Sequence, residues 1–129
     1  MIDHISIGVS DLKTSTAFYT EVLAALDYEL RDDRPKTVGF ARRGKPHSEF
    51  WLNARPGMAK MPEDTGTHIC LRTRSPEAVK AFYDAAMRLG AEDDGSPGVR
   101  PIYSDNYFAA FIRDFDGNKI EVVTFVGGG

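Results

Sequence analysis

Two of the three histidines in this chain, His4 and His68, occupy matching positions of an internal repeat. Sliding the sequence by 64 residues places His4–Glu29 on His68–Asp93, so that His-Ile falls on His-Ile and Ala-Phe-Tyr on Ala-Phe-Tyr. Because a repeat in the sequence predicts repeated structural units, the two histidines are expected at equivalent places in those units. Imidazole nitrogens bind divalent metal ions, so this pair is a candidate for part of a metal site.

Two glutamates could complete such a site, because each falls in the last strand expected of its repeat. Glu121 follows Asn118 by three residues, and Glu49 falls on Glu121 if the preceding turns are aligned with an offset of 72. Nitrogen and oxygen donors suit one divalent ion (Fe, Ni, Co, Mn or Zn), and two histidines with one carboxylate match the triad of non-haem iron oxygenases. His4, His68 and Glu121 are therefore the predicted metal ligands, with Glu49 as a possible fourth.

Each of these residues also has an ordinary structural interpretation. A histidine in a strand is often held by hydrogen bonds alone, and a glutamate in a strand usually faces water. His47 shares a strand face with Glu49 and Trp51, which makes it a reserve ligand, a substrate contact or a solvated turn residue. The repeat favours the metal site, because it places residues of the right types at related positions.

The elements that must position these side chains follow from the hydrophobic pattern. Apolar residues alternate with small or polar ones over 5–9 and again over 69–71, which predicts a strand that opens each repeat. Asp11 is a predicted N-cap of the first helix, and Ser75 caps the second, where Pro76 follows at the first helical position. Gly90 is expected to end the second helix.

Three short strands are expected after each helix. The Asp-Gly pair within 114–117 is a strong hairpin signal, and the loop Gly95–Pro101 is expected to lead into a short strand near Ile102. The fold class is therefore α+β, with module one at 1–55, a linker at 56–66 and module two at 67–126, all in a single domain 1–129. The other expected strands are Tyr28–Asp32, Thr37–Ala41, Ser48–Asn53, Tyr107–Arg113 and Asn118–Phe125.

Composition narrows the function classes. The chain has 129 residues and a net charge of −3, which gives no electrostatic reason to expect a nucleic acid or an anionic membrane as partner. Its single cysteine, Cys70, excludes a disulfide within the chain and fits the cytoplasm. The first residues lack the basic and apolar regions of a signal peptide, so a cytoplasmic enzyme or small-molecule binder is expected.

Several segments together resemble a known family. The segment 3–12 (DHISIGVSDL) followed by Ala-Phe-Tyr at 17–19 looks like the opening of the vicinal oxygen chelate superfamily, the glyoxalase, bleomycin resistance and extradiol dioxygenase group. The segments 67–69 (THI) and 114–121 (DFDGNKIE) resemble its second-half signatures, with Phe115 where the family usually has proline. The resemblance covers nearly the whole chain and implies two βαβββ modules that form a concave sheet around a central site.

The resemblance also implies a chemistry. Members commonly hold one metal through the first strand of each module and the last strands, here His4, His68, Glu121 and sometimes Glu49. Substrates bind the metal through two adjacent oxygens, and a nearby glutamate can act as base, for which Glu49 is the candidate. The implied function is a metal-dependent glyoxalase- or dioxygenase-like enzyme that acts as a homodimer on a small molecule.

Departures from the family pattern separate the alternatives. Glyoxalase I-like members hold the glutathione carboxylate with an arginine at the position of Gly8, which argues against a glutathione substrate. The serine-rich loop of fosfomycin thiol-transferases has no good counterpart in Tyr103–Phe111. Bleomycin-type proteins have the fold without the metal, so a metal-free sequestering protein is the main alternative. An interaction domain without a pocket is a third interpretation.

Four further side chains could hold a substrate. Arg100 could bind a carboxylate, while the rings of Trp51, Tyr103 and Tyr107 could stack on an aromatic or 2-oxo substrate. In the alternative interpretation, Trp51 and Tyr107 are core aromatics and Arg100 is a solvated charge in a loop.

Overall fold

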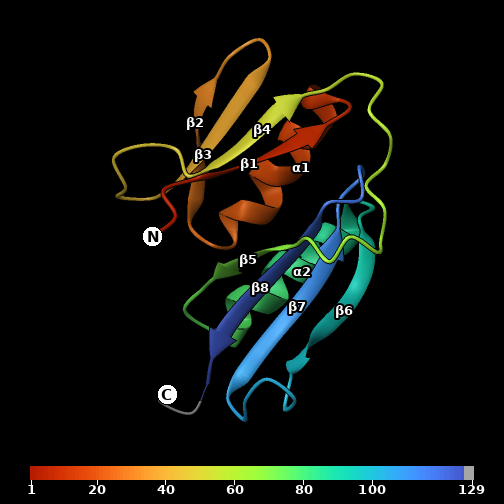
Figure 1. The fold of residues 1–129 in the computed structure, drawn as a ribbon. Coiled ribbons are helices and arrows are strands. Elements are labelled where there is room, and N and C mark those ends of the chain that lie inside the picture. The colour runs from red at the N-terminus through yellow and green to blue at the C-terminus, as the bar shows by residue number, and fades with distance from the viewer. Residues whose placement is uncertain (127–129) are drawn as a thin grey trace. The chain divides into compact units, whose positions relative to one another are not determined.

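The computed structural model describes residues 1–126, and the chain divides into two compact units, Met1–Lys60 and the part that begins at Met61. Each unit consists of one strand, one helix and three further strands in that order (Figure 1). In each unit the four strands form one mixed sheet, and the helix lies against one face of it. The predicted α+β class and the repeated βαβββ order are confirmed.

The first unit is a sheet of order β1-β4-β3-β2. β1 runs parallel to β4, whereas the other two pairings are antiparallel. This sheet packs its apolar face against the helix, where Val9, Phe40 and Leu52 have no exposed surface. The bounds are β1 Ile5–Val9, α1 Leu12–Ala24, β2 Tyr28–Asp33, β3 Thr37–Arg42 and β4 Phe50–Ala54.

Helix α1 begins where the sequence predicts. The carboxylate of Asp11 accepts hydrogen bonds from the Thr14 backbone N–H at 3.2 Å and from its hydroxyl at 2.9 Å. These bonds satisfy one of the free N–H groups of the first turn and hold the pKa of Asp11 below its usual range. One side of the helix is apolar and is buried on the sheet, with Phe18 and Val22 almost fully enclosed.

This cap predicts an acid-sensitive contribution to stability. A carboxylate with a lowered folded pKa stabilises the fold above its ordinary pKa of 3.8, and that stability is lost as the pH falls through the folded value. Between about pH 5 and about pH 2.5 the wild type should lose more stability than Asp11→Asn, whose amide caps the helix without titrating. Urea unfolding at the two pH values measures this; equal losses would contradict it.

The second unit repeats the arrangement as a sheet of order β5-β8-β7-β6, in which β5 runs parallel to β8. Its helix α2 is capped by Ser75, which accepts from the Ala78 N–H, and Gly90 follows the helix with a positive φ of 97°. Both ends agree with the sequence prediction. The bounds are β5 Ile69–Arg72, α2 Pro76–Arg88, β6 Glu92–Val99, β7 Tyr107–Arg113 and β8 Lys119–Phe125.

One element differs from the prediction. The segment 95–99, expected as a loop, belongs to strand β6, while Ile102 lies in a turn and forms no strand. The register of β6 against β7 shifts on both sides of Gly95, which has a φ of 148°. Glycine and proline therefore mark bulges in an edge strand here, because only an edge strand tolerates the lost hydrogen bonds.

The hairpin between β7 and β8 is built on Asp114. Its buried carboxylate accepts from the N–H groups of Asp116 and Asn118 at 2.9 and 2.8 Å, and from the Asn118 amide at 2.9 Å. Gly117 completes the turn with a φ of 81°. The turn therefore keeps its shape with Phe115 in place of proline. Among residues 1–126, no helix is both long and apolar enough to cross a membrane.

Candidate functional site

The second unit carries a row of polar and aromatic side chains on the sheet face away from α2. Strand pairing places Cys70 opposite Glu121 and Glu121 opposite Phe111, so these three residues lie side by side across β5, β8 and β7. Successive side chains of a strand point to opposite faces, which puts Tyr107 on the same face. Tyr107 packs there against a small apolar cluster of Ala109, Phe111 and Val123.

The Glu121 carboxylate is the centre of this face. It is only 3% exposed, and its two oxygens have different partners. Oε1 lies 3.0 Å from Nε2 of His68, and Oε2 accepts a hydrogen bond of 2.5 Å from the Tyr107 hydroxyl. The His68 side chain is 42% exposed, so one edge of this pair is open to solvent. The structure thus brings together three of the residues that the sequence singled out.

The pKa values of two neighbours of Glu121, Cys70 and Tyr107, are raised. Local burial, with the negative charge of Glu121, raises the pKa of the Cys70 thiol to about 12, although the residue as a whole is exposed. Burial and the hydrogen bond to Glu121 also raise the pKa of Tyr107. In the metal-free protein, Cys70 is therefore a neutral thiol at physiological pH.

Two positively charged side chains, Arg100 and Lys119, lie near the ring of Phe111, the residue paired with Glu121. The guanidinium of Arg100 lies 5.5 Å from the centre of the Phe111 ring, and the ammonium of Lys119 lies 5.1 Å from it. Arg100 donates from Nη1 to the Gly98 carbonyl and from Nη2 to the Ser96 carbonyl, which fixes the guanidinium in place. The positive charge that the sequence assigned to substrate binding therefore lies on the same strand face as Phe111.

Aromatic rings continue this face beyond Tyr107. The Tyr107 ring lies between Tyr103 and Phe125, at centroid distances of 5.1 and 5.5 Å. Tyr103 is exposed, and the guanidinium of Arg72 lies 4.8 Å from the centre of the Phe125 ring. The structure therefore joins two of the predicted substrate-binding residues, Tyr103 and Tyr107, in one cluster of rings that meet edge to face.

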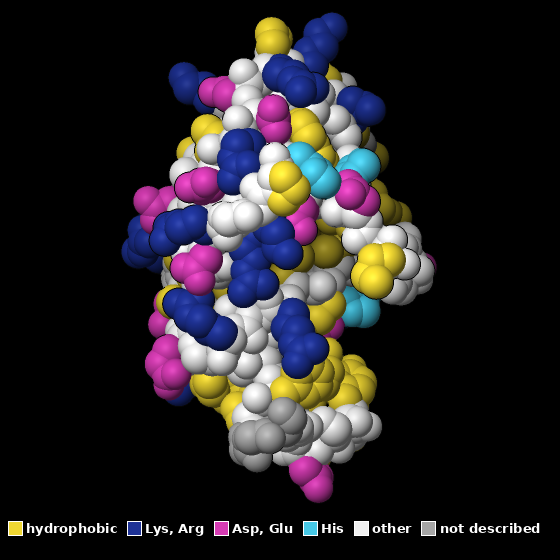
Figure 2. All heavy atoms as spheres, turned by 90° about the vertical axis from the view of Figure 1, so that its left-hand side faces the viewer, with side chains coloured by type: hydrophobic (Ala, Val, Ile, Leu, Met, Phe, Trp, Pro, Cys, Tyr) yellow, Lys and Arg dark blue, Asp and Glu magenta, His cyan; other side chains and the backbone are white. Residues whose placement is uncertain are grey.

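In the first unit, the Asp3 carboxylate forms hydrogen bonds with two histidines, His4 and His47. The carboxylate lies 2.7 Å from Nδ1 of His4 and 3.0 Å from Nε2 of His47, and these two hydrogen bonds lower the pKa of Asp3. All three histidines of the chain are exposed, and histidine side chains are visible in cyan in Figure 2. Because Nδ1 of His4 is turned to Asp3, its Nε2 is the nitrogen left for another partner.

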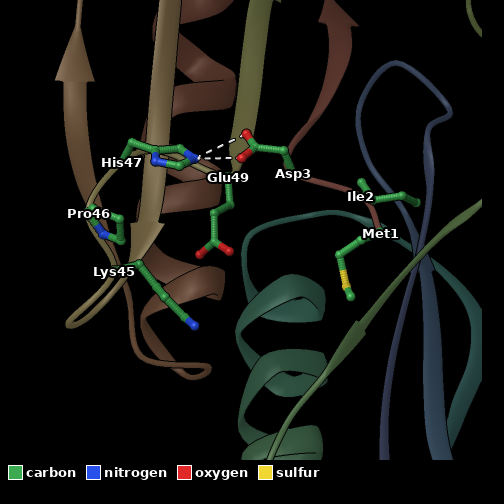
Figure 3. A pocket seen from close by; sticks show the side chains of 7 residues that line it. All are labelled: Met1, Ile2, Asp3, Lys45, Pro46, His47 and Glu49. Atoms are coloured by element: carbon green, nitrogen blue, oxygen red, sulfur yellow. Dashed lines mark hydrogen bonds and ion pairs between the residues drawn. The ribbon is translucent and has the colours of Figure 1, made fainter.

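The pair formed by Asp3 and His47 lines a hollow of about 360 Å³ together with Lys45, Pro46 and Glu49 (Figure 3). In Figure 3 the imidazole of His47 faces the Asp3 carboxylate, whereas the carboxylate of Glu49 points away from that pair. Glu49 is half-buried, and its Oε1 accepts from the Arg42 N–H at 3.4 Å. His47 is therefore tied to the N-terminal segment rather than to Glu49.

The strand register corrects the expected equivalence of Glu49 and Glu121. In the second unit Glu121 pairs with Cys70, and at the matching position of the first unit Trp51 pairs with Ser6. The alignment with an offset of 72 holds between β3 and β7, but the offset between β4 and β8 is 70. The reason is a longer connection, residues 43–49 between β3 and β4 against residues 114–118 between β7 and β8.

In the first unit, Trp51 lies at the position that matches Glu121 of the second unit, and its ring packs closely on a glycine. A Cβ atom added at Gly39 would lie 2.8 Å from the Trp51 ring and 2.6 Å from the Ser48 hydroxyl, so the indole lies directly on the glycine backbone. The guanidinium of Arg34 lies 5.4 Å from the centre of the indole ring. Gly39 is the counterpart of Phe111, so the first unit has an indole over glycine where the second has a carboxylate beside phenylalanine.

The donor atoms in the second unit suit a divalent metal. His68 Nε2 and Glu121 Oε1, which are joined by a hydrogen bond of 3.0 Å, are nitrogen and oxygen donors of the kinds that bind divalent metal ions. Within residues 1–126, no group of three or more His, Cys, Asp or Glu side chains is arranged to hold a metal. The second unit therefore supplies two donors of suitable type, and His4 of the first unit is the remaining predicted one.

The fold agrees with a comparison to known families. The family model described as "Glyoxalase/Bleomycin resistance protein/Dioxygenase superfamily" matches residues 1–122 of this chain. The chain belongs to this superfamily. Its first-half and second-half signatures therefore lie in the two units of one glyoxalase-type fold.

Similar proteins of the superfamily carry different names. This chain is 26% identical over 125 residues to the virulence protein STM3117 of Salmonella typhimurium, and the aligned part covers 97% of this chain and 84% of that protein. A solved glyoxalase/bleomycin resistance protein from Albidiferax ferrireducens is 26% identical, with a TM-score of 0.82 over 96% of this chain and 98% of that one. The fosfomycin resistance protein FosX of Listeria monocytogenes is 21% identical, with a TM-score of 0.70 over 98% and 93%, a likeness in fold.

Some of the residues described above were not expected from the sequence to have a role. Asp3 and Phe111 had no assigned role, and Tyr107 was expected to contact substrate rather than Glu121. Asp3 could have been noticed because it directly precedes His4, and aspartate commonly orients histidine ligands. The contact of Tyr107 with Glu121 joins two different strands, so only the strand register reveals it.

Proposed function

We propose that this chain is a metal-dependent enzyme of the glyoxalase or dioxygenase type, with His4, His68 and Glu121 as the metal ligands. The observation that supports it best is the buried Glu121 carboxylate, 3% exposed and 3.0 Å from Nε2 of His68. A buried carboxylate is costly unless a positive group compensates it. A divalent ion beside His68 would supply that compensation.

The proposed chemistry divides the roles among the residues. The metal, when bound, would act as a Lewis acid on a substrate with two adjacent oxygens. Glu49 is the proposed base, because it is half-buried and lines the hollow beside Asp3 and His47 (Figure 3). The Asp3 carboxylate would hold His4 in the tautomer that leaves Nε2 available.

Substrate binding is proposed for Trp51, Arg100, Tyr103 and Tyr107. Arg100, held by two backbone carbonyls, would attract an anionic group, and the exposed ring of Tyr103 would pack on an apolar part of a small molecule. A small anionic metabolite in the cytoplasm is the proposed substrate class. A homodimer is the proposed assembly, with neither nucleic acid nor membrane as partner.

The test is the metal content of protein purified without chelator, measured by mass spectrometry. The wild type should contain about one metal ion per site, and His68→Ala and His4→Ala should lose most of it. His47→Ala is the matched control, because it removes the third histidine, which bonds to Asp3, and should retain the metal. Equal and negligible metal in all four proteins would refute the proposal.

A metal-free binding protein is the second candidate, because the Phe111 ring near Arg100 and Lys119 and the aromatic cluster around Tyr107 need no metal to bind a ligand. Binding of a small anionic aromatic compound with the same affinity before and after chelation, without turnover, would favour this candidate. Loss of binding after chelation would favour the enzyme.

A further inference from the structure

We infer that Tyr107 is a positioning residue that holds Glu121 in the orientation required for metal binding. The inference rests on the proposed metal site and adds to it a residue that binds neither the metal nor its other ligands. It gives Tyr107 a role toward Glu121 in addition to the substrate contact proposed above.

The first observation is that the two oxygens of the Glu121 carboxylate have different partners. The Tyr107 hydroxyl donates to Oε2 at 2.5 Å, and Oε1 lies 3.0 Å from Nε2 of His68. The last torsion of a glutamate side chain is broad, so a free carboxylate would rotate and offer either oxygen. With Oε2 held by Tyr107, Oε1 is the oxygen presented beside His68.

The second observation is that the Tyr107 ring is itself fixed. It meets Phe125 edge-on, with an interplanar angle of 89°, and packs on the apolar cluster of Ala109, Phe111 and Val123. Strand pairing also places Tyr107 directly opposite Phe125. The hydroxyl is therefore a rigid donor, because any movement of it would disturb the packing of the ring.

The physical consequence concerns metal affinity. An outer hydrogen-bond partner orients a ligand before the metal arrives, so less freedom is lost on binding, and its removal typically weakens binding about 10–100-fold. Tyr107→Phe keeps the ring and its packing but removes the donor. Tyr103→Phe is the matched control, because it removes a hydroxyl from the adjacent ring and leaves the partners of Glu121 unchanged.

The experiment titrates metal-free protein with Co²⁺ and follows the visible absorption bands, which report both affinity and ligand geometry. Tyr107→Phe should raise the Co²⁺ dissociation constant about 10–100-fold and shift the bands, whereas Tyr103→Phe should stay within about twofold of the wild type. If Tyr107→Phe does not fold, Phe125→Leu, which loosens the same ring, should also weaken binding and shift the bands.

The outcomes separate this inference from the proposed function. Wild type and Tyr107→Phe with the same affinity and the same bands would overturn the positioning role and leave the metal site intact. A wild type that binds no Co²⁺, and that binds none of the other candidate ions in the metal-content measurement, would overturn both.

Discussion

Replacing Glu121 with glutamine is expected to weaken metal binding by more than about 100-fold while the protein stays folded, a larger effect than loss of an outer-shell partner. The substitution keeps the shape of the side chain but removes the negative charge that a divalent ion requires. The Tyr107 hydroxyl can still donate to the amide oxygen, and the amide nitrogen can donate to Nε2 of His68. Both contacts of the side chain are thereby retained.

Glu121→Gln should lower the affinity for metal without lowering the free energy of unfolding of the metal-free protein. Because a buried charge is costly without compensation, metal-free Glu121→Gln should be at least as stable as the metal-free wild type in urea unfolding. Glu77→Gln makes the same charge change on the exposed first turn of α2 and should bind metal like the wild type. Unchanged metal affinity in Glu121→Gln would remove Glu121 from the ligand set.

Replacing Gly39 with alanine is expected to destabilise the protein by about 3 kcal/mol, at the upper end of the usual range for overpacking. The new methyl group would lie 2.6 Å from the Ser48 hydroxyl, 2.7 Å from its Cβ and 2.8 Å from the Trp51 ring. Ser48 is buried and donates to Asp32 at 2.6 Å, so it cannot move aside without losing that hydrogen bond. The free energy of unfolding, measured in urea, gives the result.

Gly8→Ala is the matched control, because it changes another strand glycine of the same unit. Its Cβ would lie 3.4 Å from the flexible side chains of Arg55 and Met58, which is ordinary contact. A gain of about 0.4–1 kcal/mol is expected there, since alanine reduces the entropy of the unfolded chain. Equal effects at Gly8 and Gly39 would mean that Trp51 does not lie on the Gly39 backbone.

Much of the fold could be predicted from local signals. Asp11 and Ser75 cap their helices as expected, because an N-cap depends on residues only three positions apart. The Asp-Gly hairpin was predictable for the same reason. The prediction was wrong for β6, because the same glycine and proline residues suit both a loop and a bulged edge strand, and pairing with β7 decides between them.

The candidate site was likewise predictable only in part from the sequence. Residue types and the repeat singled out His68 and Glu121, which the structure brings to 3.0 Å. They could not show that Trp51, rather than Glu49, matches Glu121, because that depends on two additional residues in the connection between β3 and β4. A shift of two residues in a strand keeps the face and changes the neighbour, so no alternation pattern reveals it.

The sequence by itself determined the doubled architecture and the chemical types available for a site, because both are written in spacings along the chain. Only the tertiary structure decided which atoms meet: Tyr107 with one oxygen of Glu121, His68 with the other, and Trp51 on Gly39. The physical reason is that these contacts join different strands, and their distances depend on register and packing rather than on sequence separation.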